Sequence, residues 1–131
     1  MRLLLDTHAL VWALSDPAQL PGTVRKTIEN PSNMIYVSAV SIWEIAIKAA
    51  LGKIDLEIED LPNAITEVGF TELPVTIAHA CAVRKLPMHH RDPFDRMLAV
   101  QSSLENLPLI TKDPVFSLYG TNHVWNSTKS R

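Results

Sequence analysis

The sequence predicts an α/β fold in which helices cover both faces of a central, mostly parallel sheet, and three observations lead to this prediction. Short apolar runs alternate with segments of helical character along the 131 residues. The first run, Leu-Leu-Leu, carries no polar residue, which indicates a strand buried on both faces. Turn-forming residues such as Asn30-Pro31-Ser32-Asn33 separate the segments.

The expected strands are short runs of apolar, β-branched or aromatic residues. In chain order they lie at residues 2–6, 34–37, 70–73 and 107–111, with a last edge strand at 123–125. The first of them ends on Asp6. Ligands of parallel α/β sheets bind beyond the carboxyl ends of the strands, so this acid lies where such proteins keep their chemistry.

The expected helices lie between these strands and are bounded by capping or turn residues. In chain order they span residues 9–14, 21–29, 61–68 and 77–84. Ser38 or Ser41 caps a further helix that runs to Leu51 and stops at Gly52. Asp92 and Pro93 start another helix that runs to about residue 104.

Composition sets bounds on the class of protein. Nearly half of the residues are apolar, which suffices for the core of one domain over residues 1–131. The single cysteine, Cys81, rules out an internal disulfide and favours a cytoplasmic location, and neither a secretory signal nor a membrane span is expected. The formal net charge is −2, so overall charge would not hold this chain on nucleic acid.

Four acids follow the predicted strands in a common pattern. Asp6 ends the first strand, Glu44 and Asp95 lie in the opening turns of two helices, and Asp113 follows the strand at 107–111. The carboxyl ends of parallel strands share one edge of a sheet, so these carboxylates are expected to converge. Converging carboxylates repel one another, and Mg²⁺ or Mn²⁺ offsets that repulsion through oxygen ligands. Such a site predicts phosphodiester hydrolysis.

Most of these acids also have a purely structural explanation. Glu44 fits a capping box with Ser41. Asp92 and Asp95 fit the cap and the first turn of their helix, and Asp113 before proline is an ordinary turn residue. The acid that ends the first strand lacks such an explanation, and the shared edge of the sheet is the informative feature.

Polar residues next to these acids also have both a functional and a structural explanation. Thr7 and Thr111 each adjoin a candidate acid and either hydrogen-bond a metal-bound water or bond backbone at a strand end. His8, His89 and His90 lack the paired spacing of zinc ligands, and no cysteine accompanies them, so zinc is not expected.

Four motifs in order along the chain resemble PIN-domain proteins, and above all the toxins of VapBC-type toxin–antitoxin pairs. They are LLLDTHALVW (3–12), VSAVSIWEIAIK (37–48), HRDPFDRMLA (90–99) and LITKD (109–113). The resemblance implies a three-layer α/β/α PIN-like domain with Mg²⁺- or Mn²⁺-dependent endoribonuclease activity on structured RNA. It also implies inhibition by a cognate antitoxin and homodimers that assemble with it.

The resemblance carries the acidic quartet of the family onto the four acids named above. Asp6, Asp95 and Asp113 are then the metal ligands, and Glu44 is a ligand through water or orients the attacking water. Asp92 matches an additional acid whose role as ligand, support or helix cap stays open. The main alternative is a PIN-fold module that has no activity and holds a partner in its acidic pocket.

Two tryptophans are candidate anchors for a partner. Trp12 and Trp43 flank the predicted pocket, and two roles are open to them. The expected role is packing in the core, and the alternative is to stack on a base or to line a groove for a partner. An inhibitor of an acidic pocket should bring a cation, and arginine can bind a carboxylate with two hydrogen bonds. We therefore expect a basic, amphipathic partner segment.

Overall fold

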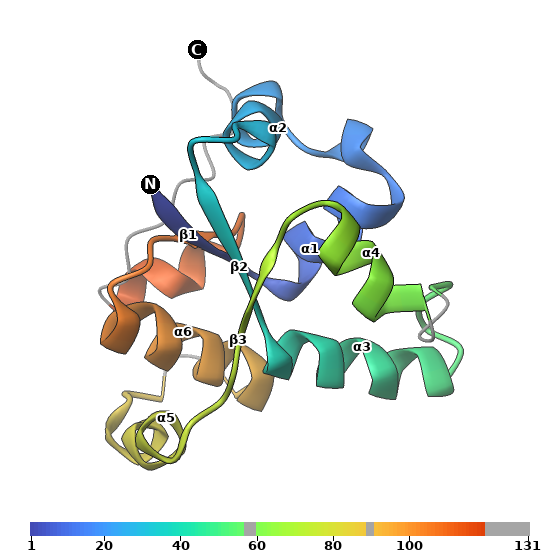
Figure 1. The fold of residues 1–131 in the computed structure, drawn as a ribbon. Helices are drawn as coiled ribbons and strands as arrows, with labels where there is room; N and C mark the ends of the chain where they lie inside the picture. Colours follow the sequence, from blue (N-terminus) through green and yellow to red (C-terminus); the bar gives the residue numbers. More distant parts are fainter. Residues whose placement is uncertain (57–59, 89–90, 120–131) are drawn as a thin grey trace.

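The computed structural model describes residues 1–56, 60–88 and 91–119, and its centre is a four-stranded parallel sheet in the order β3-β2-β1-β4 (Figure 1). The strands are β1 (Arg2–Leu5), β2 (Met34–Ser38), β3 (Thr71–Leu73) and β4 (Leu109–Ile110). Every pairing in this sheet is parallel. The predicted α/β fold with a parallel sheet is therefore confirmed.

Helices connect the strands and cover the sheet. The longer ones are α1 (Thr7–Ser15), α2 (Gly22–Glu29), α3 (Ala39–Ala50), α4 (Leu61–Glu67), α5 (Ile77–Ala82) and α6 (Pro93–Glu105). The described residues also form the 3₁₀ segments η1 (Pro17–Gln19), η3 (Val83–Lys85) and η4 (Pro114–Tyr119). Within the described ranges, none of the helices combines the length and the apolar character that crossing a membrane requires.

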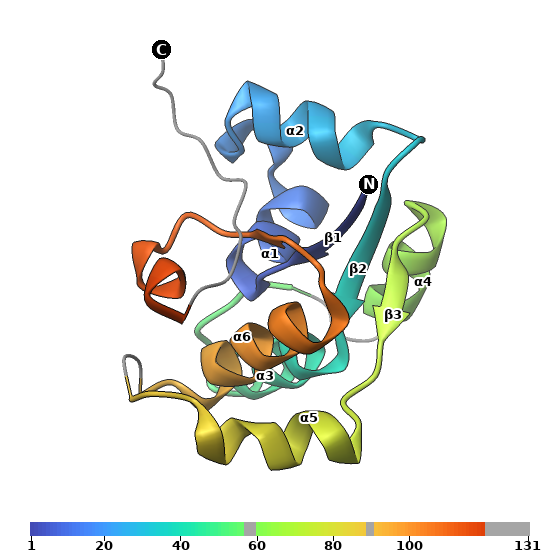
Figure 2. The same cartoon turned by 90° about the vertical axis from the view of Figure 1, so that its left-hand side faces the viewer.

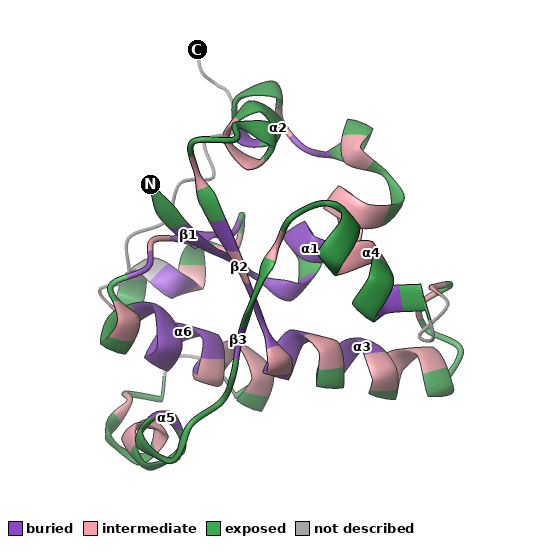
Figure 3. Cartoon of the chain, in the orientation of Figure 1, coloured by how far each residue is buried: buried purple, intermediate pink, exposed green. Residues whose placement is uncertain are grey.

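The first strand is buried on both faces, as its composition predicts. Leu3 and Leu5 belong to one apolar cluster, which also contains residues of α1, α2 and α3, whereas Leu4 belongs to a second cluster with residues of α6 and η4. Figure 3 shows the same pattern as a buried centre along β1 and β2. The sheet therefore has a hydrophobic layer on each side. Figure 2 shows α6 alongside α3, which it contacts.

The first strand and the strand predicted at residues 107–111 have different bounds in the structure, for physical reasons. The first strand ends at Leu5 because Asp6 already caps α1. The strand predicted at residues 107–111 is shorter in the structure, where it is β4. Asn106 takes a left-handed conformation (φ 54°), and the N–H of Leu107 bonds back to Ser102 to close α6. The predicted edge strand at 123–125 lies outside the described residues.

The helix predicted at 77–84 is divided into α5 and η3. The guanidinium of Arg96 donates hydrogen bonds to the carbonyls of Val83, Leu86 and Pro87 at distances of 3.1–3.3 Å. Arg96 is buried, so its charge is solvated by these carbonyls. The side chain thereby fixes the irregular segment that leads to the start of α6.

Candidate active site

A cleft of about 800 Å³ opens at the edge of the sheet where β1, β2 and β4 end. Five carboxylates line it: Asp6, Glu44, Asp92, Asp95 and Asp113. They come from the ends of β1 and β4 and from the opening turns of α3 and α6. The structure thus brings together all four acids of the predicted quartet, and Asp92 with them.

Asp6 is the most deeply placed of the strand-end acids. Its carboxylate caps α1 by accepting a hydrogen bond from the N–H of Ala9 (2.7 Å), and it receives a second one from the side chain of Thr111. The residue is only 6% exposed. Burial, opposed by these hydrogen bonds and reinforced by the charges of Asp113 and Glu44, raises the pKa of Asp6 from 3.8 to about 6.

Glu44 is almost completely buried, and both of its oxygens are engaged. The Thr7 hydroxyl donates to Oε1 (2.6 Å) and lies 3.0 Å from Ser41 Oγ, while the Lys48 ammonium donates to Oε2 (2.7 Å). The capping box predicted for Ser41 and Glu44 is wrong. Ser38 caps α3 instead, through a hydrogen bond from the N–H of Val40 (3.0 Å), and Glu44 turns into the cleft.

The acids on α6 differ in their local bonding. Asp92 is the N-cap of α6 and accepts from the N–H groups of Phe94 (2.8 Å) and Asp95 (3.4 Å). Asp95 lies in the first turn, and its side chain lines the cleft. The cap explanation for Asp92 is therefore confirmed, and the residue also lines the cleft.

Asp113 begins the η4 segment and is tied to the end of β4. Its Oδ1 accepts from the N–H of Val115 (3.0 Å), and its own N–H donates to Thr111 Oγ1 (3.1 Å). Thr111 is fully buried and bonds Asp6 as well, so one hydroxyl connects the two strand-end acids. Of the two roles predicted for these threonines, the bond to backbone at a strand end is confirmed for Thr111, and both side chains also bond a candidate acid, which was not predicted.

Three lysines share this cleft, and sequence reasoning assigned them no role. They are Lys48, Lys53 and Lys112. The signal for the first was present in the sequence, because Glu44 and Lys48 are four residues apart on one helix. Five carboxylates against three ammonium groups still leave an excess of negative charge at the site.

An aromatic group flanks the cleft on α1. The ammonium of Lys112 lies 4.8 Å from the ring centre of Trp12, and the rings of His8 and Trp12 are 4.1 Å apart. Burial, together with the charges of Lys112 and Lys48, lowers the pKa of His8, so its imidazole is neutral at pH 7. His8 therefore adds no charge to the cleft.

The two tryptophans have different environments. Trp12 is half-buried against the core and also lines the cleft, so the expectation of core packing is confirmed for it. Trp43 is 62% exposed, and its contact with Phe94 is edge-on, with ring centres 5.3 Å apart. Core packing was the wrong expectation for Trp43, because its position on α3 faces outward.

The donor set of the cleft suits a hard divalent cation. All five acids offer oxygen, the ligand that Mg²⁺ and Mn²⁺ prefer. Burial, with a smaller contribution from the charges of Asp113 and Glu44, raises the pKa of Asp6, so a cation beside this carboxylate would be favourable. In the part of the chain that the structure describes, no three such side chains form a ready-made ligand set. An ion would therefore draw the carboxylates together. His89 and His90 lie outside the described residues.

Comparison with known proteins agrees with this geometry. Residues 3–121 match the family described as "PIN domain". The chain is 30% identical to Ribonuclease VapC22 of Mycobacterium tuberculosis over 118 residues, which cover 85% of this chain and 86% of that protein.

Two solved complexes are similar in fold. One is VapBC2 from Rickettsia felis bound to a DNA fragment from its promoter, with a TM-score of 0.72 and 14% identity, over 96% of this chain and 100% of that one. The other is FitAB bound to an IR36 DNA fragment, with a TM-score of 0.65 and 17% identity, over 100% of each chain.

Proposed function

The chain belongs to the PIN-domain family, and we propose on this basis that it is a metal-dependent endoribonuclease and the toxin of a toxin–antitoxin pair. The observation that carries the proposal is the convergence of Asp6, Glu44, Asp95 and Asp113 in one cleft. A fold gains no stability from gathering like charges around a buried carboxylate, so this arrangement points to a bound cation.

Asp6, Asp95 and Asp113 would hold the ion, which is Mg²⁺ or Mn²⁺. When bound, the ion polarises the phosphate and stabilises the leaving oxygen. The residues of the chain orient the reaction. Thr111 fixes Asp6 relative to Asp113, and Thr7 fixes Glu44 at the wall of the cleft. Water attacks phosphorus in line with the bond to the ribose 3′-oxygen, so no protein nucleophile is needed.

The activity is tested with purified protein and a structured RNA. Cleavage is expected with Mg²⁺ or Mn²⁺, is lost in EDTA, and returns when the ion is restored. Ca²⁺ should support turnover poorly, because its larger and looser coordination shell positions water badly. Asp95→Asn should abolish cleavage, whereas Asp60→Asn, at an exposed residue, should not. Cleavage at full rate in EDTA would contradict the proposal, and the absence of any cleavage would favour the partner-holding module.

We further propose a protein antitoxin as partner of a homodimeric toxin in the cytoplasm, with residues 1–131 acting as one domain. The relatives support an antitoxin, since both solved complexes pair a similar fold with a partner protein. The excess of carboxylates in the cleft favours an inhibitor that brings arginine. A small neighbouring gene whose product copurifies with this chain and suppresses its RNA cleavage would support the antitoxin, and a neighbouring product that leaves cleavage unchanged would contradict it.

A further inference from the structure

We infer that the cleft takes a single divalent ion, and that the Lys48 ammonium, held by Glu44, fills the place of a second cation beside the scissile phosphate. This inference rests on the proposed metal-dependent cleavage and concerns a different side chain of the same cleft. It assigns Glu44 a positioning role toward Lys48 in place of a role as direct metal ligand.

The first argument is the bonding of Glu44. Its side chain is 5% exposed, and the Lys48 side chain is 43% exposed, so the pair lies at the wall of the cleft with the carboxylate inside. Thr7 occupies one carboxylate oxygen and Lys48 the other, at 2.6 and 2.7 Å. Charge-assisted bonds of this length are strong. A metal ion that ligates Glu44 would have to lie beside the Lys48 ammonium on the same carboxylate, where the two positive charges repel each other.

The second argument is that acids at the start of α6 also favour the positive charge of Lys48. Besides its bond to Glu44, the charges of Asp92 and Asp95 raise the pKa of Lys48, so it stays protonated at neutral pH. These two acids start α6, which packs beside α3. The ammonium is thus bonded to Glu44 of its own helix and lines the same cleft as Asp92 and Asp95 of α6, whose charges also favour it. Two-metal sites hold their ions about 4 Å apart with carboxylates between them, and here an ammonium already stands among those carboxylates.

The third argument is the hydrogen-bonding capacity of the ammonium. It carries three N–H donors, and Glu44 receives one of them. The remaining donors suit the non-bridging oxygens of a phosphate that enters the cleft. Preorganised positive charge at the place where negative charge develops lowers the barrier of phosphoryl transfer. Glu44 supplies the preorganisation, because it fixes a side chain that is otherwise flexible.

The number of bound ions tests this inference directly. Free Mn²⁺ is counted by electron paramagnetic resonance while it is titrated into the metal-free protein. The wild type is expected to bind one ion. Lys48→Gln removes the ammonium and frees Glu44 Oε2, so this variant is expected to bind two. Lys112→Gln is the matched control, because it makes the same change in the same cleft at an ammonium that lies over Trp12, and it is expected to bind one.

Each count has a distinct meaning. Two ions in the wild type would overturn the inference and leave the proposed nuclease function intact, and this measurement needs no variant. One ion in folded Lys48→Gln would also overturn it, because the ammonium would then not occupy a cation position. A second ion in both lysine variants would show a general effect of charge and would overturn the specific role of Lys48. No ion in the wild type would contradict the proposed function itself.

Discussion

Replacing Asp6 by Asn should stabilise the metal-free protein at neutral pH. The buried carboxylate has a pKa of about 6 in place of 3.8, which corresponds to at most about 3 kcal/mol of unfavourable free energy when it is ionised. Asparagine caps helices as well as aspartate does, so the bond from the N–H of Ala9 is kept. The amide also pairs with the hydroxyl of Thr111, which can accept as well as donate.

The sign of the pH dependence follows from the raised pKa. The folded protein holds the proton of Asp6 more tightly than the unfolded chain does, so this residue contributes its full stability below about pH 4. That contribution is lost as the pH rises from about 4 through 6. In the Asp6→Asn protein this stability is not lost, because asparagine does not ionise. The difference between variant and wild type should therefore be small at pH 4 and reach its maximum above pH 7.

Thermal unfolding followed by circular dichroism measures this difference in EDTA at pH 4, 6 and 8. At pH 8 the variant should melt up to about 10 °C higher than the wild type, taking about 3–4 °C per kcal/mol for a chain of this length. Mg²⁺ should stabilise the wild type and not the variant.

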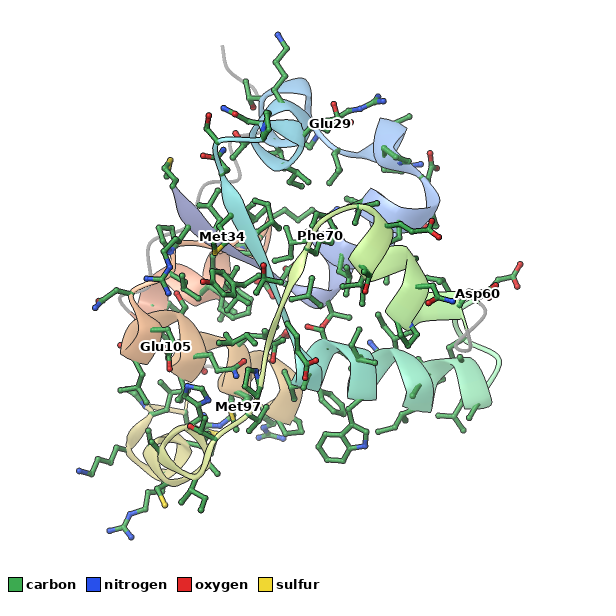
Figure 4. The ribbon with its side chains drawn as sticks, in the orientation of Figure 1. Glu29, Met34, Asp60, Phe70, Met97 and Glu105 are labelled. Atoms are coloured by element: carbon green, nitrogen blue, oxygen red, sulfur yellow. The ribbon has the colours of Figure 1, made fainter. Side chains whose placement is uncertain are left out.

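Asp60→Asn is the control, since this acid is exposed at the start of α4 (Figure 4) and makes no capping bond. A variant that is less stable than the wild type at pH 8, or a difference that does not change with pH, would refute the reasoning.

Three further substitutions separate structural from functional roles. Asp92→Ala should cost about 1 kcal/mol in urea unfolding, whereas Asp92→Asn keeps the cap and should change stability little. Gln101→Leu should cost about 2–3 kcal/mol in the same assay, because Gln101 is fully buried and pairs with Ser38, Pro74 and His79. Trp43→Ala should leave stability within about 1 kcal/mol and weaken partner binding in calorimetry; unchanged affinity would place the partner elsewhere.

The convergence of the acids could be predicted from the sequence because it depends on topology. An apolar strand that ends on Asp6, and acids that follow the ends of other strands, meet at one edge in any parallel sheet. The position of β1 between two helical layers follows from the same pattern, since each of its three leucines is buried. These features needed no knowledge of distant contacts.

The features that could not be predicted depend on residues far apart in the chain. In the sequence, Ser38 and Ser41 are both possible caps of the apolar helix that runs to Leu51. In the structure, Ser38 is the cap and donates a hydrogen bond to Gln101, which is 63 residues away. The same glutamine lies beside His79, whose other nitrogen bonds Glu105 on α6 (2.8 Å). This buried network joins β2, α5 and α6. No local pattern shows that this network makes Ser38, and not Ser41, the cap of α3. With Ser38 as the cap, Glu44 is not part of a capping box and lines the cleft.

The charges of the cleft separate into two environments, each of which suits a different kind of cation. Asp6 is held by neutral donors, the N–H of Ala9 and the side chain of Thr111, so its charge is stabilised only in part and its pKa stays raised. Glu44, on the neighbouring helix, is bonded by an ammonium of its own chain. A cation from solution should therefore bind most favourably beside Asp6, where its charge offsets the cost of burying the carboxylate and the repulsion from neighbouring acids. A phosphate that bridges the two environments would meet the ion on one side and Lys48 on the other, which orients it across the cleft for in-line attack.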